Sequence, residues 1–241
     1  MSSSWITPPG RTELIENLVS GVDRYNPSNI GILEDYLYHQ LRSGEYDCLA
    51  NLAILKLYQF NPDLYNADVV INVLLKALTT CPGPDFNLCI SLLDDRPPNS
   101  NIDEPDTLPS YLPILRGLHD LLFRCRFPAF WAVYRSSQLE ALRENYTVEV
   151  AGFEDAIREV AVHAIKATFT SIGVSRLLSY LDLEGDELPA FLRKHDWTLD
   201  ASTNAVRIPP MPNNQIEATV VQENTKLSQL TKIIAYSAAA Y

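Results

Sequence analysis

Apolar residues recur at helical spacing through almost every segment of the first 150 residues. In segment 12–22, for example, Leu14, Ile15, Leu18 and Val19 fall on one face. The segment 48–60 is apolar on nearly every side, which is typical of a helix buried between other helices. The segments with this pattern are 12–22, 30–42, 48–60, 67–80, 85–93, 112–126, 129–135 and 138–145. The pattern predicts a mainly α fold built from helix pairs.

Two of the predicted helices stop at the same three-residue motif, an aromatic residue followed by Asn and Pro. These stops are Tyr25-Asn26-Pro27 and Phe60-Asn61-Pro62, which lie 35 residues apart. A helical hairpin repeated at that period would form a short solenoid. Coincidence explains two short motifs equally well, so both interpretations stay open.

The composition of two segments breaks the helical pattern. Residues 1–11 predict a disordered N-terminal extension before a helical domain over residues 12–150. Residues 96–109 contain four prolines and several acidic side chains. This composition favours an exposed acidic loop that separates helices rather than domains.

From residue 151 the pattern changes to shorter elements. A long helix over 153–169 begins with acidic residues, and Ser175 and Asp186 are placed to cap two short helices after it. These helices precede the strand signal of the chain.

Trp197 and Leu199 alternate with polar neighbours, and Val206 and Ile208 do so again after a polar turn. This alternation predicts a small β-hairpin. Three helices and a hairpin are the parts of a winged helix, which we expect over residues 151–209.

The remaining residues, 210–241, predict a linker and a helical tail. Leu227, Leu230 and Ile234 recur at heptad-like spacing, enough for one short amphipathic helix. The stripe is equally suited to entering a partner's helical bundle and to folding back on the chain's own core.

Motifs for catalysis, cofactors and metals are missing from the sequence. The nine glycines are never closer than ten positions, which excludes Gly-rich phosphate-binding loops. The four cysteines, at 48, 81, 89 and 125, have no zinc-site spacing, so we expect buried reduced thiols. The four histidines are scattered and are expected to be structural. We therefore expect no enzyme activity, no catalytic residue, no cofactor and no metal site.

The charge balance argues against DNA and membranes as partners. The chain has 30 acidic and 19 basic residues, a net charge of −11, which disfavours phosphate backbones and anionic lipid surfaces. The winged helix is itself acidic, and its second short helix begins with two acidic residues, so DNA reading is not expected. Neither a signal peptide nor a membrane-length apolar run is visible, and we expect a cytoplasmic protein.

One stretch mixes basic and aromatic side chains and supports an alternative function. In the region Arg116 to Arg135, the residues Arg124, Arg126 and Arg135 could contact RNA while neighbouring rings stack on bases. The alternative interpretation is that Arg124 and Arg126 neutralise the end of a helix and that the aromatic rings belong to the core.

Several motifs resemble the family of k subunits of eukaryotic translation initiation factor three. The most specific is Tyr46-Asp-x-x-Ala-Asn-Leu-Ala-x-Leu-Lys-Leu-Tyr-Gln-Phe-Asn-Pro62, preceded by Asp23-Arg-Tyr-Asn-Pro27. Further matches are Leu74-Leu-Lys-Ala-Leu78, Asp85-Phe-x-Leu-Cys89, Phe127-x-x-Phe-Trp131, Gly152-Phe-Glu-Asp155 and the region of Trp197. The resemblance covers about residues 20 to 208.

The resemblance implies a HEAT-like helical array followed by a winged helix, related to the PCI modules of large assemblies. It further implies a non-catalytic scaffold subunit of a complex that binds the small ribosomal subunit and supports recruitment of mRNA and initiator tRNA. The l subunit and the e subunit are the implied partners within that complex.

Two groups of residues offer materials for such contacts. We expect Val206 and Ile208 to lie on an edge strand of the winged helix, where a partner could add a strand. We expect Leu227, Leu230 and Ile234 to form an apolar stripe able to enter a helical bundle.

Overall fold

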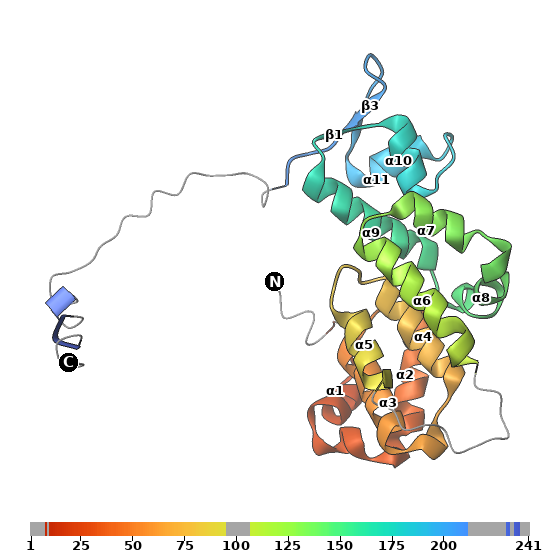
Figure 1. Ribbon diagram of the computed structural model, residues 1–241, viewed down its shortest axis with the longest axis vertical. Helices are drawn as coiled ribbons and strands as arrows, with labels where there is room; N and C mark the ends of the chain where they lie inside the picture. The colour runs from red at the N-terminus through yellow and green to blue at the C-terminus, as the bar shows by residue number, and fades with distance from the viewer. Residues whose placement is uncertain (1–7, 9, 95–106, 212–229, 232–233, 237–241) are drawn as a thin grey trace. The chain divides into compact units, whose positions relative to one another are not determined.

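The computed structural model describes residues 8, 10–94, 107–211, 230–231 and 234–236. The chain divides into two compact units, Met1–Pro209 and Pro210–Tyr241. In the first unit an array of helices leads into a winged-helix module (Figure 1). The mainly α fold class predicted from the sequence is confirmed.

The array consists of helices joined by short turns. Its helices are α1 (Glu13–Ser20), α2 (Ile30–Ser43), α3 (Cys48–Phe60), α4 (Ala67–Leu78), α5 (Asp85–Asp94), α6 (Leu108–Phe123), α7 (Phe127–Tyr134) and α8 (Glu140–Asn145). Single 3-10 turns are η2 (Val22–Tyr25), η3 (Pro27–Asn29), η4 (Pro62–Leu64), η5 (Ser137–Leu139) and η6 (Thr147–Glu149). Helix α3 packs on α2 and α5, and α4 packs on α5 and α6 (Figure 1). The apolar side chains of these helices form the core between them.

Local capping explains where several helices begin and end. The side chain of Thr12 accepts a hydrogen bond from the backbone of α1, and Asp47 does the same for α3. Asn66 caps α4 in the same way. Helix α2 ends at Gly44, whose φ of 74° lies in the left-handed region that glycine adopts without strain.

Helix α4 is the most deeply buried part of the array. Residues 69–78 are all buried, and Lys76 among them donates from Nζ to the backbone oxygen of Gln40 at 3.1 Å. The Gln40 side chain in turn donates to Asn51 at 3.0 Å. Burial lowers the pKa of Lys76 to about 8. These buried polar bonds tie α2, α3 and α4 together at fixed positions.

The expected boundary of the acidic loop is wrong at its end. Residues 95–106 lie outside the described residues, but α6 begins at Leu108, inside the predicted loop 96–109. Pro109 occupies the first turn of α6, where a missing backbone N–H costs nothing, and the buried side chain of Leu108 anchors the helix. A proline that reads as a loop residue is here a helix starter.

The predicted C-terminal boundary of the N-terminal extension is also wrong. Arg11, inside the range 1–11, has a buried side chain that pairs with Asp47. Its Nε and Nη2 atoms each donate to a different Asp47 oxygen at 2.6 Å. The carboxylate that caps α3 therefore also holds the segment before α1 against the array. Residues 1–7 and 9 lie outside the described residues.

The second part of the unit is a winged helix. Its elements are α9 (Phe153–Thr168), β1 (Ser171–Gly173), α10 (Val174–Leu181), α11 (Leu188–His195), β2 (Thr198–Asp200) and β3 (Ala205–Arg207). The predicted hairpin of β2 and β3 is confirmed, with Leu199 opposite Val206. The capping predictions are wrong by one or two residues, because α10 follows Gly173 directly and α11 follows Glu187.

The sheet contains a strand that the sequence pattern did not predict. Strand β1 pairs antiparallel with β3, which gives the order β1-β3-β2. The expected edge strand is therefore the central strand, and Val206 and Ile208 are 0% and 5% exposed. The edge prediction is wrong because a segment of only three residues, too short to show alternation, adds on the far side. The outer strands of the described sheet are β1 and β2.

Among the described residues, no helix combines the length and the apolar character that crossing a bilayer requires.

Candidate functional site

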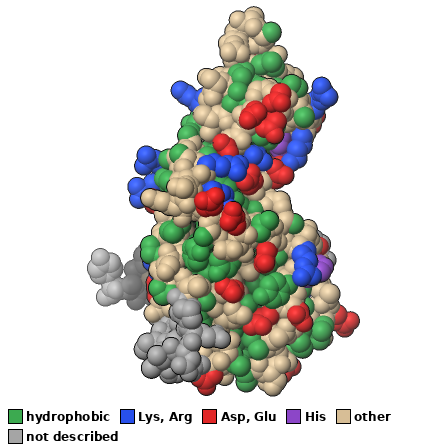
Figure 2. All heavy atoms as spheres, turned by 90° about the vertical axis from the view of Figure 1, so that its right-hand side faces the viewer, with side chains coloured by type: hydrophobic (Ala, Val, Ile, Leu, Met, Phe, Trp, Pro, Cys, Tyr) green, Lys and Arg blue, Asp and Glu red, His purple; other side chains and the backbone are tan. Residues whose placement is uncertain are grey.

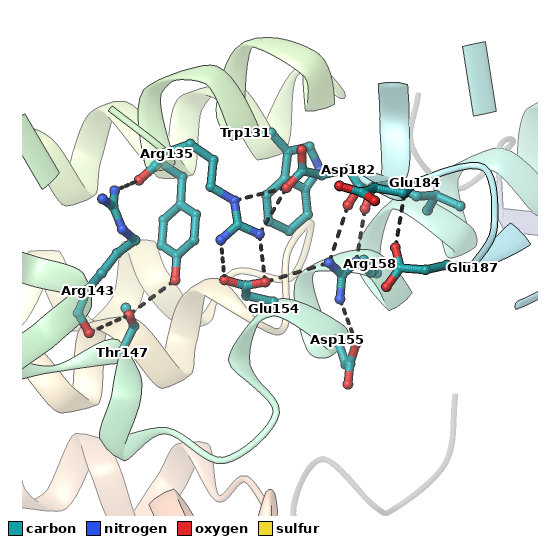
Figure 3. Close-up of polar contacts among 12 residues, drawn as sticks. Trp131, Arg135, Arg143, Thr147, Glu154, Asp155, Arg158, Asp182, Glu184 and Glu187 are labelled. Atoms are coloured by element: carbon teal, nitrogen blue, oxygen red, sulfur yellow. Dashed lines mark hydrogen bonds and ion pairs between the residues drawn. The ribbon is translucent and has the colours of Figure 1, made fainter. Parts of the chain in front are cut away.

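The array and the winged helix meet where α7, α9 and α10 come together, and we call this place the joint. Its residues are Trp131, Arg135, Glu154, Arg158 and Asp182 (Figure 3). Trp131 lies within α7 and Arg135 is its C-cap, Glu154 and Arg158 belong to α9, and Asp182 follows α10. The joint therefore connects the last helices of the array to the first helices of the winged helix.

Arg135 bridges the three elements of the joint. Its Nη1 and Nη2 atoms donate to the two carboxylate oxygens of Glu154 at 2.8 and 2.7 Å. Its Nε atom donates to Asp182 at 3.0 Å. A guanidinium offers donors in a planar fork, so one side chain can hold two carboxylates in fixed directions. The pKa of Arg135 is raised, chiefly by the hydrogen bond to Glu154.

Arg158 secures the same corner from the other side. Its Nε atom donates to the backbone oxygen of Leu181 at 2.9 Å, and Nη1 donates to Asp155 at 2.8 Å. Asp182, with φ of 51° and ψ of 51°, ends α10 in the left-handed conformation. A cation at the carbonyl end of a helix is favourable, so Arg158 stabilises the end of α10.

Trp131 packs beneath both arginines. Its indole Nε1 donates to the backbone oxygen of Tyr180 at 2.9 Å. The guanidinium carbons of Arg135 and Arg158 lie 5.7 and 5.6 Å from its ring centroid, within cation–π range. The buried indole ring gives the joint its apolar contact, and the hydrogen bonds of the two arginines orient α9 and α10 relative to α7.

A second cluster beside the joint holds the turn after α7. The hydroxyl of Tyr134 donates to Oγ1 of Thr147 at 3.1 Å, and Thr147 donates to the backbone oxygen of Arg143 at 3.1 Å. Arg143 donates back to the backbone oxygens of Tyr134 and Ser136. Burial raises the pKa of Tyr134, so the hydroxyl stays protonated and keeps donating.

The joint borders a polar hollow of about 520 Å³. Arg135 and Arg158 line it together with acidic side chains, among them Glu184 and Glu187. Within the described ranges, no group of His, Cys, Asp or Glu side chains is arranged to hold a metal ion. The arrangement fixes the direction of the winged helix relative to the end of the array by hydrogen bonds and ion pairs.

The structure separates the residues of the predicted RNA surface. Arg124 pairs with Asp120 at 2.8 Å, Arg126 is exposed, and Arg135 is part of the joint. The aromatic side chains between them are buried, namely Phe127, Phe130, Trp131 and Tyr134. Basic and acidic side chains also lie interspersed on the face drawn in Figure 2. Bases cannot stack on buried rings, so the aromatic part of the RNA hypothesis is wrong.

The predicted partner-binding residues have different environments. Val206 and Ile208 are buried in the centre of the winged helix. Leu227 lies outside the described residues. Leu230 and Ile234 have helical backbone conformation and exposed side chains. Among the described residues of the partner-binding prediction, Leu230 and Ile234 are therefore the accessible ones.

The predicted fate of the cysteines is confirmed for three of them. Cys48, Cys81 and Cys89 are free and buried, and burial raises the pKa of each thiol. Cys125 is exposed and lies in the turn between α6 and α7, where its backbone is left-handed with a φ of 55°.

Two histidines pack against aromatic rings, and their described side chains are largely removed from solvent. His119 stacks on Phe86 with 4.4 Å between ring centroids, and His195 lies 4.5 Å from Phe191. These ring contacts fit the predicted structural role.

Comparison with known proteins gives one consistent result. Residues 64–219 match the family described as CSN8/PSMD8/EIF3K. A protein of Mycosarcoma maydis named eukaryotic translation initiation factor 3 subunit K is 41% identical, covering 97% of this chain and 94% of that protein. Its namesake in Cryptococcus neoformans is 43% identical over 98% of this chain and 95% of that protein. The corresponding protein of Phaeosphaeria nodorum is 35% identical and covers 97% of each chain.

Proposed function

Since the chain belongs to the CSN8/PSMD8/EIF3K family, we propose that it is a subunit of eukaryotic translation initiation factor 3 and acts there as a non-catalytic scaffold. The observation that carries the proposal is identity of 41–43% over nearly the full length of two relatives named subunit K. The match extends over the array, the joint and the winged helix together. The proposed location is the cytoplasm.

The architecture supports action through protein contacts. An array of helices offers long exposed faces, and a winged helix offers outer strands. The described polar groups of the joint form hydrogen bonds and ion pairs with one another. This suits a region that sets the direction of the winged helix relative to the array. We propose that the chain contacts the l subunit and the e subunit, and that it reaches the small ribosomal subunit through the complex. In this way it supports recruitment of mRNA and initiator tRNA.

Two surfaces are proposed for these contacts. The tail offers Leu230 and Ile234, which are exposed on helical backbone. The winged helix offers β2 rather than β3, because β2 is an outer strand and carries the exposed Leu199.

The experiment is to mix the purified chain with the l subunit and measure the mass of the product by size exclusion with light scattering. The full chain and a version ending at Pro212 are compared. We expect a 1:1 complex with the full chain. Loss on truncation assigns the contact to the tail, and survival assigns it to the winged helix or the array. Absence of a complex with either version contradicts the proposed contact with the l subunit.

A parallel measurement tests the RNA alternative. Charge reversal of the exposed Arg124 and Arg126 is expected to leave RNA affinity and its salt dependence unchanged. A steep salt dependence that disappears in the R124E/R126E variant would support an RNA-contacting adaptor instead.

A further inference from the structure

An apolar groove crosses the outer face of α3, far in sequence from the joint. Its floor is formed by Leu49, Leu52 and Ala53, with Val19 of α1 on one side and Leu92 of α5 on the other. The groove has a volume of about 300 Å³. It exists because α1 and α5 both contact α3 without covering the face between them.

This uncovered face bears on the apolar residues of α3, which the helices of the array do not cover completely. Helix α3 is apolar on nearly every side, and such a helix is normally covered all round. Here Leu49, Leu52, Lys56 and Phe60 follow one another at helical spacing and form a stripe along α3. The first three residues remain half-buried, and Phe60 at the end of the stripe is 59% exposed. The stripe follows helical spacing over about 17 Å at about 1.5 Å per residue, which is the length of about three helical turns.

The two aromatic-Asn-Pro motifs meet at one end of the groove. The rings of Tyr25 and Phe60 pack edge to face, with 6.2 Å between their centroids. The guanidinium of Arg24 and the ammonium of Lys56 each lie 4.8 Å from the centroid of one of these rings. The shared motif thus places two exposed rings and two cations together.

The charge of the groove is opposite to that of the chain. Both charged residues among its described lining, Arg24 and Lys56, are basic, whereas the chain has a net charge of −11. Two acidic residues of the neighbouring helices are paired elsewhere, Glu16 of α1 with Arg11 at 2.8 Å and Asp94 of α5 with Arg116 at 2.6 Å, and the exposed Asp23 precedes Arg24 outside the described lining. Clustered cations beside an apolar floor favour an anionic amphipathic ligand.

We propose that this groove docks an amphipathic α-helix of another subunit, with leucine-like residues on one face and acidic residues beside it. The inference rests on the proposed function, because it assumes that the chain works within a complex. Helix-in-groove docking uses anchors at i, i+3, i+4 and i+7, which the length of the α3 stripe accommodates.

Charge argues against the chain's own tail as the occupant. Residues 224–241 contain Lys226 and Lys232 and no Asp or Glu, so the tail would bring cations to a basic rim. Helix α1 of a second copy is disfavoured too. Helix α1 has acidic residues beside an apolar stripe, but its stripe of Ile15, Leu18 and Val19 is buried in its own array.

The first test uses a labelled helical peptide of about 15 residues, whose helical length of about 22 Å covers the stripe of about 17 Å with about one turn to spare. One peptide carries Leu at anchor spacing with Glu flanks, and its partner peptide carries Lys flanks. Fluorescence anisotropy with the full chain is expected to show about tenfold tighter binding of the Glu peptide. Equal affinity for the two peptides would overturn the proposal.

Variants of the full chain locate the binding. R24E/K56E is expected to reverse the preference, whereas R176E, which makes the same kind of change at an exposed winged-helix site, should have no effect. Leu52→Asp places a carboxylate on the floor of the groove at a half-buried position and should weaken binding of the Glu peptide about tenfold. The melting curve of this variant is measured alongside as the control for folding. Undiminished binding to both variants would contradict the assigned surface.

The second test identifies the occupant in the assembled factor. A photo-reactive benzoylphenylalanine replaces Leu52, and cross-linked peptides are identified by mass spectrometry. We expect a segment of another subunit with apolar residues at helical spacing and acidic flanks. Cross-links to residues 224–241, to a second copy, or to no other subunit would overturn the proposal. Incorporation of the variant into the factor, measured in the same sample, reports separately on the proposed function.

Discussion

The array and the joint use the same kind of ion pair in different solvent environments. In the array, Arg11 and Asp47 have side chains 2% and 0% exposed. At the joint, Arg135 and Glu154 are 44% and 33% exposed. Both arginines hold a carboxylate through two hydrogen bonds. The difference in solvent decides how much each pair contributes, because water screens exposed charges and leaves buried charges dependent on their partner.

The array and the joint are therefore held together in different ways. The array has an apolar core in which Asp47 accepts bonds from Arg11, from Tyr36 and from the backbone of Ala50, so its polar groups cannot be lost singly without cost. The joint is directed by charges that salt can weaken. We therefore expect the array to be rigid and the direction of the winged helix to respond to ionic strength.

The largest effect is expected from Asp47→Ala. The substitution leaves the Arg11 guanidinium buried without its carboxylate and removes the cap of α3, which should lower the free energy of unfolding by about 3–5 kcal/mol. Urea denaturation measures the change. Asp94→Ala, which breaks the exposed pair with Arg116, is the matched control and should cost at most about 1 kcal/mol. Equal losses in both variants would contradict the contrast between buried and exposed pairs.

A smaller effect is expected from Trp131→Phe at the joint. This change removes the bond from the indole to the backbone of Tyr180 and part of the buried ring, and should cost about 2 kcal/mol. The same denaturation experiment applies. If stability were unchanged, Trp131 would not be the apolar contact that joins the two parts.

The exposed pair at the joint should contribute less and should depend on salt. A double-mutant cycle of R135A and E154A is expected to give a coupling of about 0.5–1 kcal/mol at low salt. The coupling should nearly vanish in 1 M NaCl, where the Debye length is about 3 Å. A coupling that persisted in high salt would show that the joint resembles the buried pair after all.

The smallest expected effect is the change in stability with pH. It involves one histidine in the array and one in the winged helix. Burial lowers the pKa of His119 in the array and of His195 in the winged helix below the ordinary value near 6.5. The unfolded chain therefore binds protons first, and stability should fall as the pH drops from 7 through 6.5 toward 5. The melting temperature of H119L/H195L should fall less over this range than that of the natural chain. An identical decrease in both proteins would show that these residues do not carry the effect.

The helices of the array could be predicted from the sequence because apolar spacing there is dense and capping is local. The bounds of α3, with Asp47 as its cap, agree with the prediction. The predicted bounds were wrong where one residue type is common in two kinds of structure. Pro109 reads as a loop residue and starts a helix, and Arg11 reads as part of a polar extension and is buried.

Features that depend on tertiary contacts could not be predicted. Strand β1 has three residues, too few to show alternation, and its presence moves β3 from the edge to the centre. At the joint, Glu154 and Arg158 stand at helical spacing and could have been paired from the sequence. The link from Arg135 to Asp182 spans 47 residues and is set by how α7 and α10 pack. The groove on α3 was equally hidden, because an all-round apolar helix predicts complete burial.

We expect this chain to work as a stoichiometric part of an initiation factor, and the composition of the factor that purifies with it tests this expectation. The tagged full chain is purified from cells of its source organism at its natural level, and co-purifying proteins are quantified by mass spectrometry. The other subunits of translation initiation factor 3 are expected in equimolar amounts, together with the small ribosomal subunit. Recovery of those subunits no greater than with an unrelated acidic protein would contradict this role of the chain.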